Sequence, residues 1–213
     1  MSMKKFFFLA FALMLTASAF AQREAGTLSI KPRAGVNIAY YGESQNSFSM
    51  YETTTSPRIG VAAGIELEYQ VHKKVGLSAG AIYSQQGEKA KISNGWGSTA
   101  KMTAKTDYVN FPILANIYLY KGLALKFGVQ PGINVNASYT SGSNTSGDLS
   151  DLGINIKKFD LSIPFGLSYE YKFLVIDARY NLGVTNIVDS VEKTWNRVAQ
   201  ITVGLKFDVL KKH

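Results

Sequence analysis

The chain has 213 residues, and none of them is a cysteine. Without cysteine it can form neither a disulfide framework nor a thiol-linked lipid anchor. Its 23 basic and 15 acidic residues give a formal net charge of +8, which suits an anionic partner such as nucleic acid or a lipid surface.

Residues 1–21 are predicted to be a cleaved secretory signal peptide. Lys4 and Lys5 precede an apolar stretch over 6–15, and an A-x-A cleavage site ends at Ala21. The stretch is shorter than the ~20 residues of a spanning helix. An exported chain meets lipid rather than nucleic acid, so no nucleic-acid partner is expected. Residues 22–213 are expected to form one domain.

Apolar and polar residues alternate over long segments of this domain, which predicts strands with two different faces. Eight strands are expected, over 28–41, 57–71, 75–87, 107–120, 123–139, 158–172, 174–186 and 195–208. No apolar run in the domain approaches 18 residues. A membrane-spanning β-barrel remains possible, because its strands are apolar only at every second residue.

The connections between these strands are of two kinds. Tight turns are expected near 72–74, 121–122 and 172–173, and long polar connections cover 42–56, 87–106, 140–157 and 187–195. Alternation of short and long connections is typical of an outer-membrane barrel with periplasmic turns and extracellular loops. The sequence therefore predicts an all-β, eight-stranded, antiparallel up-and-down transmembrane barrel with both chain ends at the periplasmic rim.

A soluble lipocalin-like barrel is the main alternative, and it would turn the apolar faces inward. Those faces carry large residues throughout, whereas eight strands leave an interior only just wide enough for side chains. The signal peptide, the long loops and the tyrosines near strand ends, such as Tyr69, Tyr139 and Tyr171, favour apolar faces turned to lipid.

Charged residues on the opposite, inward faces are expected to meet in one layer. The predicted interior network consists of Arg33, Lys126, Arg179 and Lys206 with Glu66, Glu68, Glu170 and Asp177. Buried charges are tolerated when they are paired and hydrogen-bonded, so four cations and four anions predict a plug in the lumen. The alternative, a charged constriction that selects ions, needs an open path that eight strands do not provide.

Three prolines lie inside expected strands. Pro112, Pro131 and Pro164 cannot donate a ladder hydrogen bond, so each is predicted to mark a bulge or an interrupted bond.

Catalytic and metal-binding patterns are not evident. The two histidines are His72, in a tight turn, and His213, the last residue, and neither is placed for acid–base catalysis near the outer rim. Asp148 and Asp151 do not have the spacing of an EF-hand calcium loop. We expect no enzymatic activity, no cofactor and no metal.

The second long connection is rich in cations. Its candidate contact residues are Lys89, Lys91, Trp96, Lys101 and Lys105. Basic and aromatic residues above a membrane could bind lipopolysaccharide or a partner protein, and an ordinary solvated loop is the alternative.

Two motifs give the chain a family resemblance. Phe111-Pro112-Ile113-Leu114 opens the fourth expected strand, and Asp177, Arg179, Tyr180 and Gly183 form a D-x-R-Y-x-x-G pattern in the seventh. With KPRAGVNIAYY near the start, these segments resemble the PorT-like outer-membrane β-barrel family of Gram-negative bacteria. The resemblance implies a small outer-membrane barrel with an accessory role in secretion or envelope assembly, and it supplies no catalytic residues.

The sequence thus predicts a monomeric, non-enzymatic outer-membrane protein that acts as a secretion or envelope accessory or as a scaffold for binding loops. Its expected partners are outer-membrane lipid, lipopolysaccharide, and secretion or envelope proteins. A small-solute channel and a membrane-embedded lipid-modifying enzyme or protease are the alternatives.

Overall fold

Long antiparallel strands dominate the computed structural model, which describes residues 24–43, 52–93, 99–120, 122–142, 145–189 and 193–211. The predicted signal peptide lies outside these residues. The strands are β1 Leu28–Glu43, β2 Glu52–His72, β3 Val75–Ser93, β4 Thr99–Asn110, β5 Ile113–Tyr120, β6 Leu123–Ser141, β7 Thr145–Asp148, β8 Phe159–Tyr171, β9 Leu174–Gly183, β10 Thr194–Leu205 and β11 Phe207–Leu210, with a short 3₁₀ helix η1 at Leu149–Leu152.

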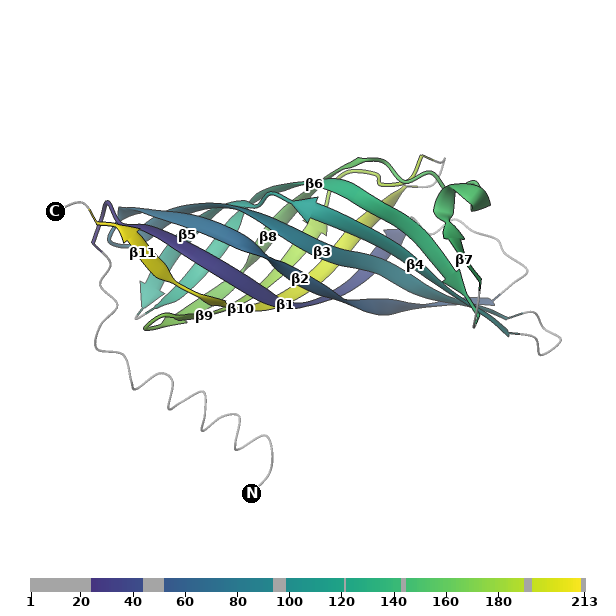
Figure 1. Ribbon diagram of the computed structural model, residues 1–213, viewed down its shortest axis with the longest axis horizontal. Helices are drawn as coiled ribbons and strands as arrows, with labels where there is room; N and C mark the ends of the chain where they lie inside the picture. The colour runs from purple at the N-terminus through teal and green to yellow at the C-terminus, as the bar shows by residue number, and fades with distance from the viewer. Residues whose placement is uncertain are drawn as a thin grey trace, which may run out of the picture.

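These strands close into a barrel, because β1 pairs with both β2 and β10 (Figure 1). Strands β4 and β5 are two halves of one crossing, since both lie between β3 and β6. Strand β11 continues β10 along β1, and β7 adds to the outer end of β6. The ring therefore has eight antiparallel crossings, and the predicted eight-stranded up-and-down barrel is confirmed.

The three tight turns lie together at one end of the barrel, beside β11, while β7 and η1 lie at the opposite end (Figure 1). Each tight turn has two residues between paired strand ends, as in the pairs His72↔Val75, Tyr120↔Leu123 and Tyr171↔Leu174. Outer-membrane barrels have short periplasmic turns and longer extracellular loops, so we call the tight-turn end the periplasmic end and the opposite end the extracellular end.

The apolar faces point away from the barrel axis. Ile59, Phe127 and Ile201 are 70%, 51% and 50% exposed, whereas the buried side chains are mostly polar or charged. This distribution is the reverse of that in a soluble barrel and matches a surface covered by lipid. Within the described residues, no helix is long and apolar enough to cross a membrane.

Two of the predicted proline interruptions coincide. The fourth crossing breaks between β4 and β5 at Pro112, and Pro131 of β6 lies opposite this break. There the carbonyl O of Pro131 accepts a hydrogen bond from the Phe111 N–H at 2.8 Å. Pairing with β6 is present before the break, in β4, and after it, in β5. The break therefore interrupts one crossing locally and does not open the barrel.

Pro164 interrupts a different ladder. It pairs with Asn181 of β9, but the pairing of β8 with β6 skips from Phe165 to Ser162 on either side of it. The missing proline N–H thus falls on the β6 side of the strand, as predicted.

Inward glycines allow close approach of neighbouring strands. A Cβ atom at Gly35 would lie 2.0 Å from the Ile201 carbonyl O, and one at Gly128 would lie 2.0 Å from the Ile113 carbonyl O. Either side chain would force the strands apart, so glycine is required at both positions.

The closure of the barrel can be tested with engineered disulfides, because the native chain has no cysteine to compete. Val36 and Ile201 are partners across the closing β1–β10 pair. Opposed antiparallel residues have Cα atoms ~4.5–5.5 Å apart, within disulfide range. The variant Val36→Cys with Ile201→Cys is therefore expected to oxidise to a crosslink, seen as faster migration of the boiled, non-reduced protein.

The matched control is Val36→Cys with Leu205→Cys, which is four residues out of register on the same face. Equal crosslinking of both pairs would contradict the closing register.

Candidate functional site

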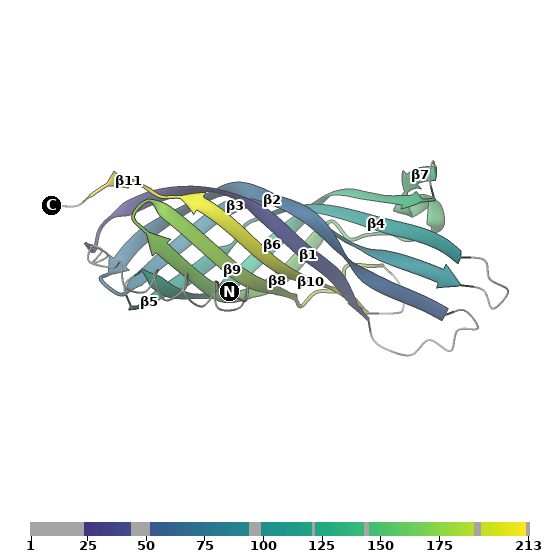
Figure 2. The same ribbon diagram turned by 90° about the horizontal axis from the view of Figure 1, so that it is seen from below.

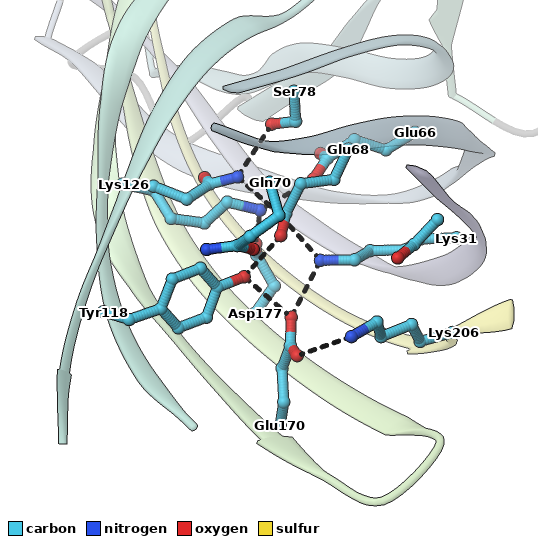
Figure 3. Close-up of polar contacts among 12 residues, drawn as sticks. Lys31, Glu66, Glu68, Gln70, Ser78, Tyr118, Lys126, Glu170, Asp177 and Lys206 are labelled. Atoms are coloured by element: carbon cyan, nitrogen blue, oxygen red, sulfur yellow. Dashed lines mark hydrogen bonds and ion pairs between the residues drawn. The ribbon is translucent and has the colours of Figure 1, made fainter. Parts of the chain in front are cut away.

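The periplasmic end of the lumen holds an ion-pair cluster around Lys31, which we call the lower cluster (Figure 3). The Lys31 Nζ lies 2.8 Å from Glu68 Oε2 and 2.8 Å from Glu170 Oε1. The Tyr118 hydroxyl donates to Glu68 Oε1 at 2.6 Å and to Glu170 Oε1 at 3.1 Å. Lys206 approaches Glu170 Oε2 at 3.8 Å from the β10–β11 junction. These side chains come from β1, β2, β5 and β8, so they span the barrel.

A second group of charges, the central cluster, lies farther from the tight turns. The Lys126 Nζ bridges Glu66 Oε1 and Asp177 Oδ2, at 2.8 Å from each. Arg179 donates to Asp177 Oδ1 from Nε at 2.7 Å and to Glu66 Oε2 from Nη2 at 3.1 Å. The Arg33 Nη1 lies 3.0 Å from Glu66 Oε2. Three cations from β1, β6 and β9 therefore meet two carboxylates from β2 and β9.

The charged side chains of the central cluster are buried, so the loss of any one contact carries a large cost in stability. The Glu66 and Asp177 side chains are fully buried, and those of Lys126, Arg33 and Arg179 are at most 2% exposed. A buried carboxylate without a partner is costly, whereas one that several cations contact keeps its charge. The central cluster is thus a set of mutually dependent charges rather than a series of independent pairs.

All eight residues of the predicted interior network point into the barrel, but they form two clusters instead of one layer. Arg33, Glu66, Lys126, Asp177 and Arg179 form the central cluster, and Glu68, Glu170 and Lys206 belong to the lower one.

Lys31 is a charged member of the lower cluster that the sequence prediction missed. It lies two residues before Arg33 on the same strand face, and its side chain is 1% exposed. The period of two in β1 was the signal that could have found it. Lys31 adds a fifth cation to the four predicted, and Asp208 of β11 lies 3.5 Å from Lys206 as a fifth carboxylate.

Polar side chains continue the filling of the lumen toward the extracellular end. Asn37 Nδ2 donates to Ser84 Oγ at 2.9 Å, and Gln200 Nε2 donates to Asn37 Oδ1 at 2.9 Å. Farther out, Asp160 accepts hydrogen bonds from Asn196 Nδ2 at 2.8 Å and from the Thr185 hydroxyl at 2.7 Å. The interior is therefore occupied by a succession of cross-strand polar contacts.

On the extracellular side, several strands continue beyond the level of barrel closure. The β1–β2 pairing ends at Ala39↔Arg58, but β2 stays paired with β3 as far as Glu52↔Ser93. Strands β4 and β6 pair up to Met102↔Ser141, and β7 adds to β6. These strands form an outer sheet that projects past the barrel (Figure 2).

Four of the predicted contact residues lie on one face of this outer sheet, which we call the lysine face. Lys91 is directly opposite Lys101, Lys89 is opposite Thr103, and Lys105 is opposite Gly87. Opposed residues of paired strands share a face. The fifth predicted contact residue, Trp96, lies outside the described residues.

The carboxylates of the same hairpin are engaged elsewhere. Glu88 is buried and accepts a hydrogen bond from the Tyr41 N–H at 3.1 Å. Asp107 accepts from the Tyr83 hydroxyl at 3.0 Å and pairs with Arg58 at 3.4 Å. Among the described side chains, none of the four lysines takes part in an ion pair. The lysine face therefore carries a local excess of positive charge.

The remaining candidate residues have local structural roles. His72 ends β2 at the periplasmic side, where its Nδ1 accepts a hydrogen bond from the Lys74 N–H at 3.4 Å. Asp148 and Asp151 form a capping box on η1. Within the described ranges, no group of three or more His, Cys, Asp or Glu side chains is arranged to hold a metal ion. His213 lies outside these ranges.

Comparison with known proteins gives a family match over most of the chain. The family model described as "Outer membrane protein beta-barrel domain" matches residues 20–189. No curated protein matches the chain.

Similar solved structures include small barrels from several bacteria. The attachment invasion locus protein Ail of Yersinia pestis has 15% identity and a TM-score of 0.49, with 86% of this chain and 100% of that chain covered. OprG from Pseudomonas aeruginosa has 13% identity and a TM-score of 0.46, with 90% and 100% covered. Neisserial surface protein A has 14% identity and a TM-score of 0.43, with 84% and 97% covered. Identities this low carry no information on ligands or activity.

The mutual dependence of the central cluster can be measured by unfolding. The substitution Lys126→Met removes the ammonium group that lies 2.8 Å from each of the two buried carboxylates, and it is expected to lower the free energy of unfolding by ~3–5 kcal/mol. Glu66→Gln should also destabilise the protein, and the double variant should lose less than the sum of the two single losses, because the two side chains contact each other. Urea unfolding in lipid vesicles, followed by tryptophan fluorescence, would measure these losses.

The control is Lys157→Gln, because Lys157 pairs with Asp189 at 3.9 Å on the exposed surface. Surface pairs contribute ~0–1 kcal/mol. A loss for Lys126→Met no larger than for this control would contradict a tightly coupled central cluster.

Proposed function

Because the chain belongs to the outer membrane protein β-barrel domain family, we propose that it is a non-enzymatic scaffold whose outer sheet binds anionic lipopolysaccharide. The observation that carries this proposal is the lysine face, Lys89, Lys91, Lys101 and Lys105, held on paired strands beyond the barrel. The barrel fixes the sheet in the bacterial outer membrane, and the sheet provides the binding surface.

A filled lumen supports a scaffold rather than a channel. The lower and central clusters cross the barrel with contacts of 2.8 Å between side chains of strands that are not neighbours in the ring. Eight strands enclose an interior only just wide enough for side chains. A solute would have to break several buried ion pairs to pass.

The position of the lysine face suits the head-group region of the outer leaflet. Tyr83 is exposed on the lipid-facing side of β3, and Lys89 follows it by six residues. At ~3.4 Å per residue this is ~20 Å along a tilted strand, above the apolar belt. Phosphate and carboxylate groups of lipopolysaccharide lie in that zone and are complementary to lysine ammonium groups.

The pairing of β3 with β4 favours the binding of an anion for two reasons, one electrostatic and one entropic. Lys91 and Lys101 are held opposite each other, although like charges in this arrangement destabilise a strand pair. An anion between the two ammonium groups would relieve this repulsion. The sheet also fixes the backbone of both residues in advance, which lowers the entropy lost on binding.

A role in secretion or envelope assembly is a further part of the proposal, and it rests on the PorT-like resemblance of the motifs at 111–114 and 177–183. In that role the monomeric barrel would present the same outer sheet to a secretion or envelope protein. The proposed lipopolysaccharide contact would then position the sheet for that partner.

The closed lumen predicts the absence of conductance. Refolded wild-type protein in a planar bilayer should give a flat current trace, because the ion-pair clusters fill the lumen. Insertion of the refolded protein is checked independently by the different migration of unboiled and boiled samples on a denaturing gel, because the closed hydrogen-bonded barrel resists detergent. Steps from the wild-type protein would support the channel alternative instead.

The lysine face can be tested with purified rough-type lipopolysaccharide and the refolded full chain. The variant Lys89→Gln, Lys91→Gln, Lys101→Gln should raise the apparent Kd about tenfold or more, since each lysine near an anionic surface contributes ~1 kcal/mol. Microscale thermophoresis at low and high salt would measure the change.

The matched control for this experiment is Lys157→Gln, Lys158→Gln, Lys193→Gln, which removes the same charge from other exposed positions. Equal weakening by both triple variants would indicate a general charge effect and contradict a defined site.

A further inference from the structure

The periplasmic end of the barrel carries a second concentration of lysines. All three tight turns contain lysine: Lys73 and Lys74 between β2 and β3, Lys121 between β5 and β6, and Lys172 between β8 and β9. Of these, Lys121 lies outside the described residues. Lys73, Lys74 and Lys172 are all exposed, and we call them the turn lysines.

The turn lysines are not neutralised by neighbouring carboxylates. Asp208, the acidic residue of β11, lies 3.5 Å from Lys206 and 3.7 Å from Lys211, so it is already paired. Among the described residues, Lys73, Lys74 and Lys172 take part in no ion pair. The charge of the three turns is therefore available to an external anion.

The backbone at Lys172 gives an independent indication. Lys172 has a φ of 54° and is the one non-glycine residue with positive φ among the described residues. Glycine or asparagine normally occupies such turn positions, because a side chain there is disfavoured. The turn that ends at Leu174 thus keeps a cation where an uncharged residue would fit the backbone better.

Aromatic side chains at the same level connect the turns to the lipid boundary. The Lys172 Nζ lies 5.6 Å from the centre of the Tyr171 ring, and Tyr171 is 40% exposed on the lipid-facing side of β8. Phe173, in the same turn as Lys172, is 61% exposed, and Tyr120, at the end of β5, is 58% exposed. Exposed aromatic side chains are typical of the boundary between acyl chains and head groups.

From these observations we infer that the turn lysines bind the phosphate groups of anionic phospholipids in the periplasmic leaflet. The ammonium of Lys172 lies against a lipid-facing aromatic ring, which favours head groups in the membrane plane over a ligand deeper in the periplasm. The β2–β3 and β8–β9 turns lie on opposite sides of the ring, so Lys73 with Lys74 and Lys172 bind separate lipid molecules. Surface lysines attract anionic lipid. Both places are at the opposite end of the barrel from the lysine face, and the inference is independent of the proposed function.

The experiment uses the refolded full chain in mixed micelles of phosphatidylglycerol and phosphatidylcholine. Native mass spectrometry would count the lipids of each kind that remain bound. Wild-type protein should retain phosphatidylglycerol preferentially, and the variant Lys73→Gln, Lys74→Gln, Lys172→Gln should reduce this preference by about fivefold or more. The corresponding arginine variant should keep the preference, because it keeps the charge.

The control Lys157→Gln, Lys158→Gln, Lys193→Gln has the same change in net charge and should behave as the wild type. Unchanged preference in the turn variant, or an equal loss in the control, would overturn the inference. Binding to isolated peptidoglycan would be measured for the same proteins. If the turn variant kept its lipid preference but lost binding to peptidoglycan, the turns would be assigned to the cell wall, and the inference would be overturned.

A single substitution separates binding from folding. Lys172→Gly removes the charge but suits the positive φ, so it should lower the phosphatidylglycerol preference while the free energy of unfolding stays equal or rises. A purely structural role for Lys172 predicts no change in lipid preference.

Discussion

The closing hydrogen-bonded ladder between β1 and β10 is the constraint on which the rest of the molecule depends. Lipid offers no hydrogen-bond partners, so every strand edge within the membrane must be paired, and only a closed ring achieves this. Closure with eight crossings leaves a narrow interior, which side chains must fill. The polar lumen, the inward glycines and the ion-pair clusters all follow from this requirement.

The same constraint makes the interior charges interdependent. Glu66 contacts Lys126, Arg33 and Arg179 at 2.8, 3.0 and 3.1 Å, and these residues belong to three different strands. No two neighbouring strands could satisfy this carboxylate alone. The ladder and the central cluster therefore stabilise the same closed state, one through the backbone and the other through side chains.

Much of the fold could be predicted because the period of two persists over whole crossings. The alternating row of Leu125, Phe127 and Val129 on β6 identifies the lipid-facing side without any tertiary information. The interruption at Pro112 was also predictable, since proline lacks the donor that a ladder needs. Strand existence, facing direction and the order of short and long connections are local properties, and local patterns record them.

The grouping of the interior charges was not predictable in the same way. Which charges meet depends on the stagger between strands, and the sequence of each strand does not contain that stagger. Lys31 joins Glu170 across 139 positions of the chain, and Lys126 joins Glu66 across 60. One layer was therefore expected where the structure has two clusters. The lysines of the lysine face, in contrast, stand out in the local composition of the sequence. That Lys91 lies opposite Lys101 could not be predicted, because it depends on the register of the β3–β4 hairpin.

The residues of the central cluster come from β1, β2, β6 and β9, and this distribution along the chain has a consequence for insertion into the membrane. Arg33 and Glu66 lie on the first two strands, which are paired, but Asp177 and Arg179 belong to the last third of the chain. A partly inserted sheet that lacked β9 would expose Lys126 and Arg33 to hydrocarbon without one of their two carboxylates. Insertion strand by strand is therefore unfavourable, and the charges couple entry into the membrane to arrival of the carboxy-terminal strands. The barrel is expected to enter the bilayer nearly complete, as a single cooperative unit.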